Sequence, residues 1–209
     1  MSDSDPPVVL IVEDEPDVAE TYERWLQDYD VRRVESGDAA IEQLDDSVDV
    51  VLLDRMLPGM SGADVLEKIR SREIDCQVAM VTAVDPSFDI IEMGFDEYVT
   101  KPPEREQLRE TVEKLLHRAT LDDDLQEYYS LVARRATLEA EFAEDRLDSN
   151  DEYVDLVDQI ETHRASVDAA MGDMGSDSEF VGAVREIMDD TTRNSSSDED
   201  EDRFTGPTE

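Results

Sequence analysis

The stretch VVLIVEDEP at residues 8–16 shows the pattern that decides the fold. Five consecutive apolar, largely β-branched residues are typical of a strand that is buried on both faces, as the strands of parallel sheets are. Three acidic residues follow directly, and Pro16 is suited to the first turn of a helix. The stretch therefore predicts a buried strand with carboxylates at its carboxyl end, followed by a helix.

The same alternation of strand and helix signals continues to residue 118. Further strands are predicted at 31–34, 48–53, 78–81 and 98–99, and helices at 16–29, 37–44, 61–71, 86–93 and 104–118. Ser61 with Asp64 three residues later resembles a capping box, which supports the start of the third helix. Five strands alternating with five helices predict an α/β domain whose parallel sheet is covered by helices on both faces.

Beyond residue 120 the strand signals end and the apolar residues take helical spacing as far as Met171. A turn cluster at 148–150 separates two helices, and Ser149 with Glu152 predicts a capping box at the start of the second. The two helices form an antiparallel hairpin. Because its apolar stripes are narrow, the hairpin is expected to pack against the first domain, a further helix or a second copy of itself. Its arginines are expected to pair with acidic neighbours; they are Arg134, Arg135, Arg146 and Arg164.

These signals divide the chain into four parts. They are a disordered N-terminus at 1–6, the α/β domain at 7–118, a helical domain at 119–189 with a short third helix at 179–189, and an acidic tail at 190–209. The tail is expected to be disordered because it has too few apolar residues to offset the entropy cost of ordering.

The 209 residues include 57 acidic and 19 basic residues, which gives a formal charge of −38. The tail alone does not account for this excess, because residues 1–118 hold 30 acidic and 12 basic residues. Neither half has the broad positive field on which nucleic-acid binding usually relies. With 16 Arg and only 3 Lys, the composition resembles that of halophiles that accumulate salt, in which molar salt shrinks the Debye length to ~3 Å.

The remaining composition predicts a soluble, cytoplasmic protein with no membrane partner. No apolar run approaches the ~20 residues of a membrane span. The opening MSDSDPP is acidic and lacks the basic and apolar regions of a secretion signal. A single cysteine, Cys76, excludes an internal disulfide framework and a cysteine-rich metal site.

Functional residues of an open parallel sheet gather just beyond the carboxyl ends of its strands. These positions hold Glu13 and Asp14 after the first strand, Asp54 at the end of the third, Thr82 at the end of the fourth and Lys101 after the fifth. Each alone is more commonly a cap, surface or packing residue, but their order and placement together indicate a site. Converging carboxylates favour Mg²⁺, which prefers oxygen ligands, and suit phosphoryl transfer to a carboxylate nucleophile.

Residues 6–118 resemble the receiver domain of two-component response regulators in spacing and in every signature residue. The resemblance implies a flavodoxin-like sheet with strand order 2-1-3-4-5. It implies that Asp54 accepts a phosphoryl group from a histidine kinase. It also implies that Glu13, Asp14, Asp54 and the backbone carbonyl of Met56 hold Mg²⁺.

The same resemblance assigns the switch residues. Lys101 would pair with the phosphoryl oxygens, Thr82 would turn its hydroxyl onto the phosphoryl group, and Tyr98 would be the aromatic switch. Pro58 and Gly62 match the loop after the acceptor. The departures are Glu13, where many members have Asp, and a short fourth helix on the face through which a receiver would dimerise.

Residues 120–188 resemble the HalX domain found after receivers in haloarchaeal proteins, which agrees with the halophilic composition. This resemblance implies little about mechanism. The leading hypothesis is a phosphorylation-operated switch that is not an enzyme beyond slow self-dephosphorylation. In it, the hairpin senses the face around the fourth and fifth helices. A homodimer through the receiver or the hairpin is left open.

Two alternatives belong to other classes. A DNA-binding transcription regulator would need a helix-turn-helix or a basic patch, and the C-terminal half has neither signal. An aspartyl phosphohydrolase would need a second acid two residues after the nucleophile, where this sequence has Met56.

Overall fold

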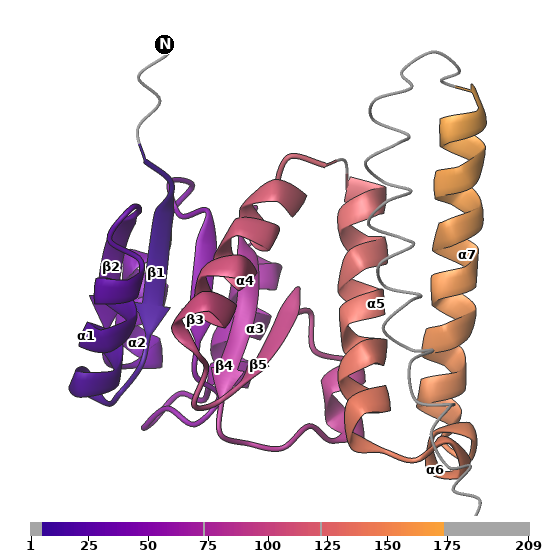
Figure 1. Ribbon diagram of the computed structural model, residues 1–209, viewed down its shortest axis with the longest axis horizontal. Coiled ribbons are helices and arrows are strands. Elements are labelled where there is room, and N and C mark those ends of the chain that lie inside the picture. The colour runs from indigo at the N-terminus through magenta and orange to yellow at the C-terminus, as the bar shows by residue number, and fades with distance from the viewer. Residues whose placement is uncertain (1–5, 73, 122, 174–209) are drawn as a thin grey trace, which may run out of the picture. The chain divides into compact units, whose positions relative to one another are not determined.

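The computed structural model describes residues 6–72, 74–121 and 123–173 (Figure 1). The strands are β1 (Val8–Val12), β2 (Asp30–Val34), β3 (Val50–Leu53), β4 (Gln77–Thr82) and β5 (Glu97–Thr100). The helices are α1 (Pro16–Trp25), α2 (Gly37–Gln43), α3 (Gly62–Ser71), the 3-10 helix η1 (Phe88–Ile91), α4 (Arg105–Arg118), α5 (Asp123–Glu141), α6 (Glu144–Asp148) and α7 (Asp151–Asp173). Apart from Pro6, the predicted disordered ends and the predicted helix at 179–189 lie outside the described residues.

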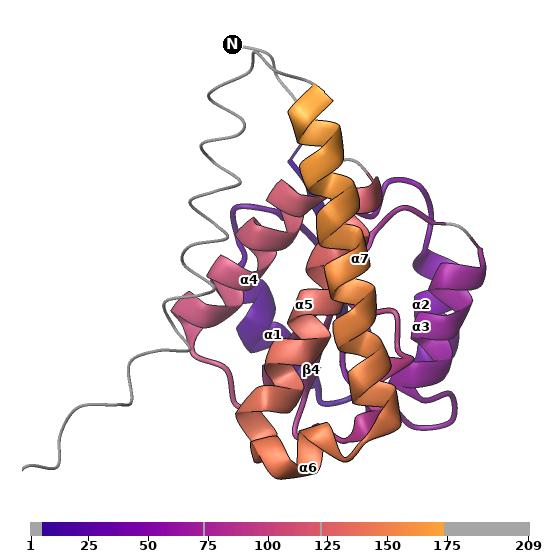
Figure 2. The same cartoon turned by 90° about the vertical axis from the view of Figure 1, so that its right-hand side faces the viewer.

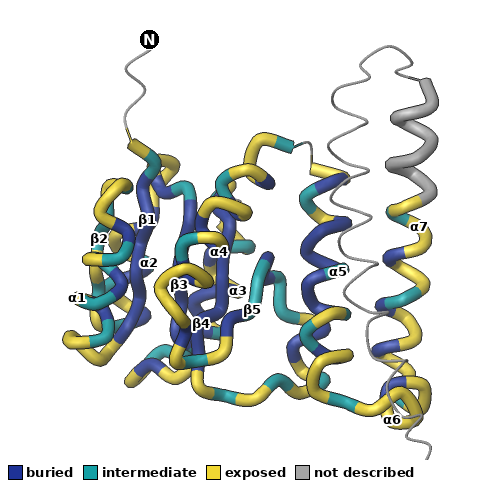
Figure 3. Tube along the Cα trace, viewed as in Figure 1, coloured by how far each residue is buried: buried dark blue, intermediate teal, exposed yellow. Residues whose placement is uncertain are grey.

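The strands form one parallel sheet in the order β2-β1-β3-β4-β5. Every residue of β1, β3 and β4 is buried, as Figure 3 shows in dark blue. Helices α1 and α4 cover one face, and α2 and α3 cover the other (Figure 1). The predicted fold and strand order are therefore confirmed.

A core of apolar side chains joins the central strands to α1 and α4. Ile11, Leu52 and Val81 from three strands pack with Leu108 and Leu115 from α4, and all are at most 2% exposed. Burial of this apolar surface is the main favourable term in folding. It also fixes the positions of the strand ends.

Two helices of the α/β part differ from the predicted ones by more than one residue at an end. The helix predicted over 16–29 ends at Trp25, because Leu26 leaves the helical conformation and the chain must reach Asp30, whose N–H bonds the Pro7 carbonyl at 2.9 Å. The helix predicted over 86–93 is the four-residue η1. Such 3-10 helices are used in short pieces, and here only a few residues separate η1 from β5.

The predicted helical hairpin is present, but its turn contains α6, which the sequence did not indicate (Figure 2). The predicted Ser149 cap is wrong. Ser149 ends α6 in a helical conformation, with its hydroxyl bonded to the Arg146 carbonyl at 3.0 Å. An N-cap residue needs extended backbone. Asn150 is the cap instead, and its Oδ1 accepts a hydrogen bond from the Tyr153 N–H at 2.8 Å.

The hairpin packs on the first domain, one of the three options left by its sequence. Helix α5 contacts β5 and η1. Its buried residues include Leu125, Leu131 and Leu138, and the start of α7 adds Leu156 and Ile160. The described residues up to 165 belong to one compact unit.

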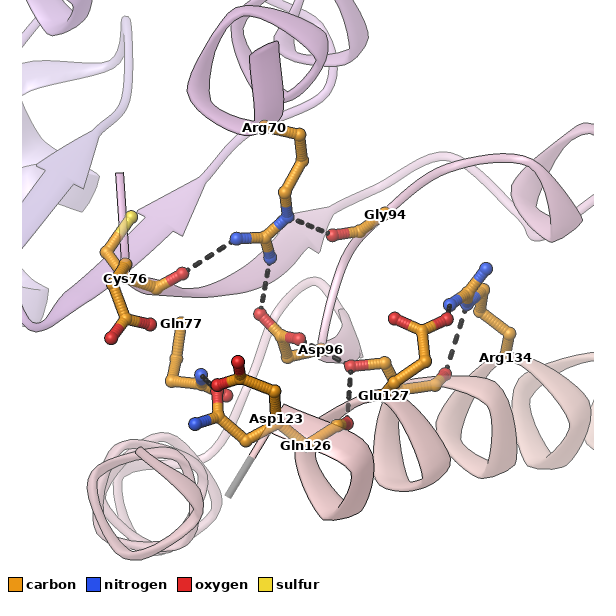
Figure 4. A pocket seen from close by; sticks show the side chains of 11 residues that line it. Arg70, Cys76, Gln77, Gly94, Asp96, Asp123, Gln126, Glu127 and Arg134 are labelled. Carbon is orange, nitrogen blue, oxygen red and sulfur yellow. Dashed lines mark hydrogen bonds and ion pairs between the residues drawn. The ribbon is translucent and has the colours of Figure 1, made fainter. Parts of the chain in front are cut away.

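A polar network joins α5 to the α/β part at the amino end of β5 (Figure 4). We call Arg70, Asp96, Arg118, Ser130 and Arg134 the junction network. Asp96, 5% exposed, accepts hydrogen bonds from Arg70 at 2.6 Å and from Ser130 at 2.5 Å. Arg118 donates to the Asp96 carbonyl at 2.7 Å, and Arg134 donates to the last carbonyl of η1 at 2.9 Å. Most of these side chains line a cavity of about 420 Å³.

A second contact lies at the other end of α5. The rings of Phe88 in η1 and Phe142 after α5 stack with centroids 4.7 Å apart, and the Arg146 guanidinium lies 4.3 Å from the Phe142 ring centroid. We call these three residues the aromatic clasp. Arg146 therefore departs from the expected acidic pairing because the aromatic rings attract its cation. Arg134 and Arg135 do pair with acidic residues of α5.

The single cysteine lies buried just before β4. Burial raises the pKa of the Cys76 thiol from its ordinary 9.0 to about 12. Because the thiolate is the reactive form, we expect a thiol reagent at pH 8 to leave the native protein unlabelled. In urea the same reagent should add one label to each chain. The folded state holds the thiol proton more tightly, so this contribution to stability is complete below pH 9.0 and is lost as the pH rises towards 12. Rapid labelling of the native protein would contradict this expectation.

Candidate functional site

The predicted site residues lie together at the carboxyl edge of the sheet. Glu13 and Asp14 follow β1, Asp54 follows β3, Thr82 ends β4 and Lys101 follows β5. The topology produces this convergence, because the carboxyl ends of parallel strands share one edge.

Three carboxylates form the centre of the site. Oxygens of Glu13, Asp14 and Asp54 all lie within 4.8 Å of one another. Glu13 is 2% exposed and Asp54 is 7% exposed, whereas Asp14 is open to solvent. Like charges this close repel unless a cation joins them. An all-oxygen donor set with one solvent-exposed side fits Mg²⁺, which binds carboxylates and retains several waters.

Lys101 links the two buried carboxylates. Its Nζ lies 2.6 Å from Glu13 Oε2 and 2.5 Å from Asp54 Oδ2. Burial raises the pKa of Glu13, and its hydrogen bond with Lys101 opposes this rise. Burial alone would lower the pKa of Lys101, but the hydrogen bonds with Asp54 and Glu13 outweigh it and the pKa is raised. The ammonium group therefore stays charged and offsets part of the negative charge.

The loop after Asp54 holds this carboxylate in place. The Met56 N–H donates to Asp54 Oδ1 at 2.9 Å, while the predicted role of the Met56 carbonyl as a metal ligand stays a prediction. Gly62 packs directly against this turn, because a Cβ there would come within 2.1 Å of the Asp54 carbonyl oxygen. Any side chain at position 62 would displace the backbone that positions Asp54.

The two predicted switch residues share a contact in the loop after β4. The Thr82 side chain is fully buried, and its hydroxyl accepts a hydrogen bond from the Val84 N–H at 3.3 Å. The Tyr98 hydroxyl donates to the Val84 carbonyl at 2.6 Å. A movement of Thr82 therefore reaches Tyr98 through one residue of backbone.

Sequence reasoning missed Arg55, the residue directly after Asp54. Its guanidinium forms an ion pair with Asp89 in η1. The two residues are 34 positions apart, and neither belongs to a recognisable pattern. No local signal could therefore have paired them.

The fold and the site together define a class. Residues 9–113 match the response regulator receiver domain, and residues 117–184 match the HalX domain. Because the first match covers half of the chain, this chain belongs to the response regulator receiver family. It is a two-component response regulator whose receiver is followed by a HalX domain as the output domain.

Two relatives show how far the likeness extends. A Haloferax volcanii protein provisionally named a transcriptional regulator is 40% identical over 188 residues, covering 89% of this chain and 32% of that protein. The sensory transduction protein RegX3 of Mycobacterium tuberculosis is 41% identical over 121 residues, covering 55% of this chain and 53% of that protein. The chain thus spans about a third to a half of the length of these relatives. The haloarchaeal relative agrees with the halophilic composition.

Solved structures resemble the first part of the chain. The signal receiver domain of a Vibrio parahaemolyticus protein, provisionally named a Luxo repressor, has a TM-score of 0.52 and 35% identity, covering 56% of this chain and 95% of that one. The receiver domain of the Francisella response regulator 1452 has a TM-score of 0.50 and 27% identity, covering 55% of this chain and 99% of that one. None of the described helices is both long and apolar enough to cross a membrane.

Proposed function

We propose that Asp54 accepts a phosphoryl group from a histidine kinase in a Mg²⁺-dependent reaction, and that the modified receiver changes the state of the HalX helices. The observation that carries this proposal is the environment of Asp54. Its carboxylate is buried, fixed by the Met56 N–H and by Lys101, and within 4.8 Å of two further carboxylates. A carboxylate held in this way serves better as an acceptor than as a structural cap.

The reaction follows from these contacts. An oxygen of Asp54 attacks phosphorus, a P–O bond to Asp54 forms, and the bond from phosphorus to the donor nitrogen breaks. Lys101 is close enough to exchange its contact with Asp54 for one with a phosphoryl oxygen. Glu13, Asp14 and Asp54 would hold Mg²⁺, which when bound neutralises charge on the phosphoryl oxygens.

The phosphorylated protein acts as a switch rather than as the intermediate of a hydrolase. A phosphohydrolase would have its second acid two residues after the nucleophile. In this chain that position is Met56, which is 67% exposed. No acid at that position can protonate a leaving group. Slow attack of water on the acyl phosphate returns the protein to its starting state.

The test uses the full-length protein in molar KCl with Mg²⁺ and either acetyl phosphate or phosphoramidate, whose P–N bond resembles that of phosphohistidine. We expect the intact mass to rise by one phosphoryl group, and EDTA to prevent the rise. Reduction with borohydride should convert residue 54 to homoserine, which tandem mass spectrometry locates. A folded protein that gains no phosphoryl group from either donor, or gains it at another residue, would overturn the proposal.

A further inference from the structure

Arg55 has the contacts of a group that can change partners. Its side chain is 17% exposed and pairs with Asp89, whose side chain is 49% exposed. One guanidinium nitrogen, Nη1, is buried and lacks a hydrogen-bond partner among the described residues. Burial raises the pKa of Tyr98, and both the charge of Arg55 and a hydrogen bond with its guanidinium oppose that rise, so the cation also contacts the switch tyrosine. Arg55 thus places a partly buried cation near Tyr98, and it directly follows Asp54 in the chain.

The partner of Arg55 lies next to the aromatic clasp. Asp89 follows Phe88 within the four residues of η1, and Phe88 stacks on Phe142 at 4.7 Å with the rings 8° from parallel. Arg146 of α6 covers the same pair of rings. One short helix therefore carries the receiver-side ion pair and the HalX-side ring contact at adjacent positions. Helix η1 can transmit a change at one of them to the other.

We propose that Arg55 is the positioning residue that couples Asp54 to the HalX helices. In the unphosphorylated protein it holds η1 through Asp89, and when Asp54 is phosphorylated it leaves Asp89 for the phosphoryl oxygens. The inference rests on the proposed function, because it requires the phosphoryl group on Asp54. The exchange makes and breaks only ionic and hydrogen bonds.

The charges and the hydrogen-bonding chemistry of the two anions favour this exchange. A phosphoryl group brings a charge of about −1.5 to −2 and three strong acceptor oxygens. A guanidinium group matches phosphate oxygens with two parallel N–H donors. Asp89 offers a single charge on a side chain that is half exposed and therefore screened by solvent. The phosphoryl group is thus the stronger partner for Arg55.

Loss of the Arg55 contact would loosen η1 and with it the aromatic clasp. Phe142 and Arg146 bring the end of α5 and helix α6 into contact with Phe88 of η1, while Arg134 of α5 bonds the Ile91 carbonyl at the other end of η1. Coupling between two sites is reciprocal in free energy. The hairpin therefore also determines how readily Arg55 becomes available to the phosphoryl group.

Hydrogen exchange of the full-length protein, with and without acetyl phosphate and Mg²⁺, tests the inference. In the wild type we expect phosphorylation to speed exchange in residues 138–148 by about tenfold, within the range typical of coupled sites. Asp89→Asn should speed exchange in this segment without any phosphoryl donor. Arg55→Gln should show equally fast exchange before and after phosphorylation, whereas Arg55→Lys should keep part of the response because it keeps the charge.

The matched control is Asp28→Asn, which breaks the ion pair of Asp28 with Arg109, 2.9 Å long and remote in sequence from η1. It should respond as the wild type does. The intact mass of the same samples shows whether each protein is phosphorylated, and this separates the two proposals. If Arg55→Gln is phosphorylated and its exchange still becomes tenfold faster, the role of Arg55 is overturned while the proposed function stands. If the wild type takes up no phosphoryl group, the proposed function fails, and the inference with it. Unchanged exchange in unphosphorylated Asp89→Asn also overturns the link to the clasp.

Discussion

Asp54→Asn is expected to take up no phosphoryl group from acetyl phosphate or phosphoramidate. The amide replaces the carboxylate oxygens that must attack phosphorus, while its size and shape are nearly those of Asp. Lys101 keeps its 2.6 Å contact with Glu13, so one buried carboxylate remains paired and the fold should persist. Intact mass after incubation with Mg²⁺ gives the phosphorylated fraction directly.

The control for this variant is Asp46→Asn, which changes an exposed aspartate between α2 and β3. It should take up phosphate like the wild type, which excludes a general effect of removing one charge from an acidic protein. Circular dichroism in molar KCl checks that both variants are folded. If folded Asp54→Asn were phosphorylated at the wild-type level, the acceptor would have to be another residue.

Asp96→Ala is expected to lower the free energy of unfolding by about 3–5 kcal/mol, the range for removing one partner of a buried charge pair. The Asp96 carboxylate accepts hydrogen bonds from Arg70, from Ser130 and from the Val78 N–H, the last at 2.7 Å. Without it, the buried Val78 N–H loses its acceptor and the Arg70 guanidinium loses its anion. Since domains are stable by roughly 5–15 kcal/mol in total, this is a large fraction.

Urea unfolding in molar KCl measures this effect, because urea leaves the ionic strength unchanged. Asp75→Ala is the matched control: Asp75 lines the same cavity but is exposed, and its loss should change stability by less than about 0.5 kcal/mol. Ser130→Ala should cost about 1 kcal/mol, the net value of one hydrogen bond. Equal stabilities of Asp96→Ala and Asp75→Ala would show that the junction network contributes little.

The sheet and the site could be predicted because their signals are local. The apolar run 8–12 and the residue at the end of each strand identify themselves within a few positions, and parallel pairing then brings Asp54, Thr82 and Lys101 to one edge. The junction network and the Arg55–Asp89 pair could not be predicted. Their contacts between segments join residues 22 to 43 positions apart, and each is an ordinary charged or polar residue in its own segment.

The errors at the hairpin turn have the same origin. Ser149 has the right residue type for a cap, but α6 extends through Asp148 and leaves Ser149 in a helical conformation. The cap therefore moves to Asn150. The helical character of 144–148 comes with the burial of Leu147 against its neighbours, and a sequence of five residues with one apolar member gives no sign of that burial.

The contact of α5 with β5 and η1 has a consequence for how the protein responds to its own abundance. The receiver and α5 belong to one chain, so their encounter is first order and its extent does not depend on the protein concentration. Strand β5 is at the edge of the sheet, and its contact with α5 covers it within the same chain. The contact between α5 and the receiver is therefore formed within one chain and does not require a second copy.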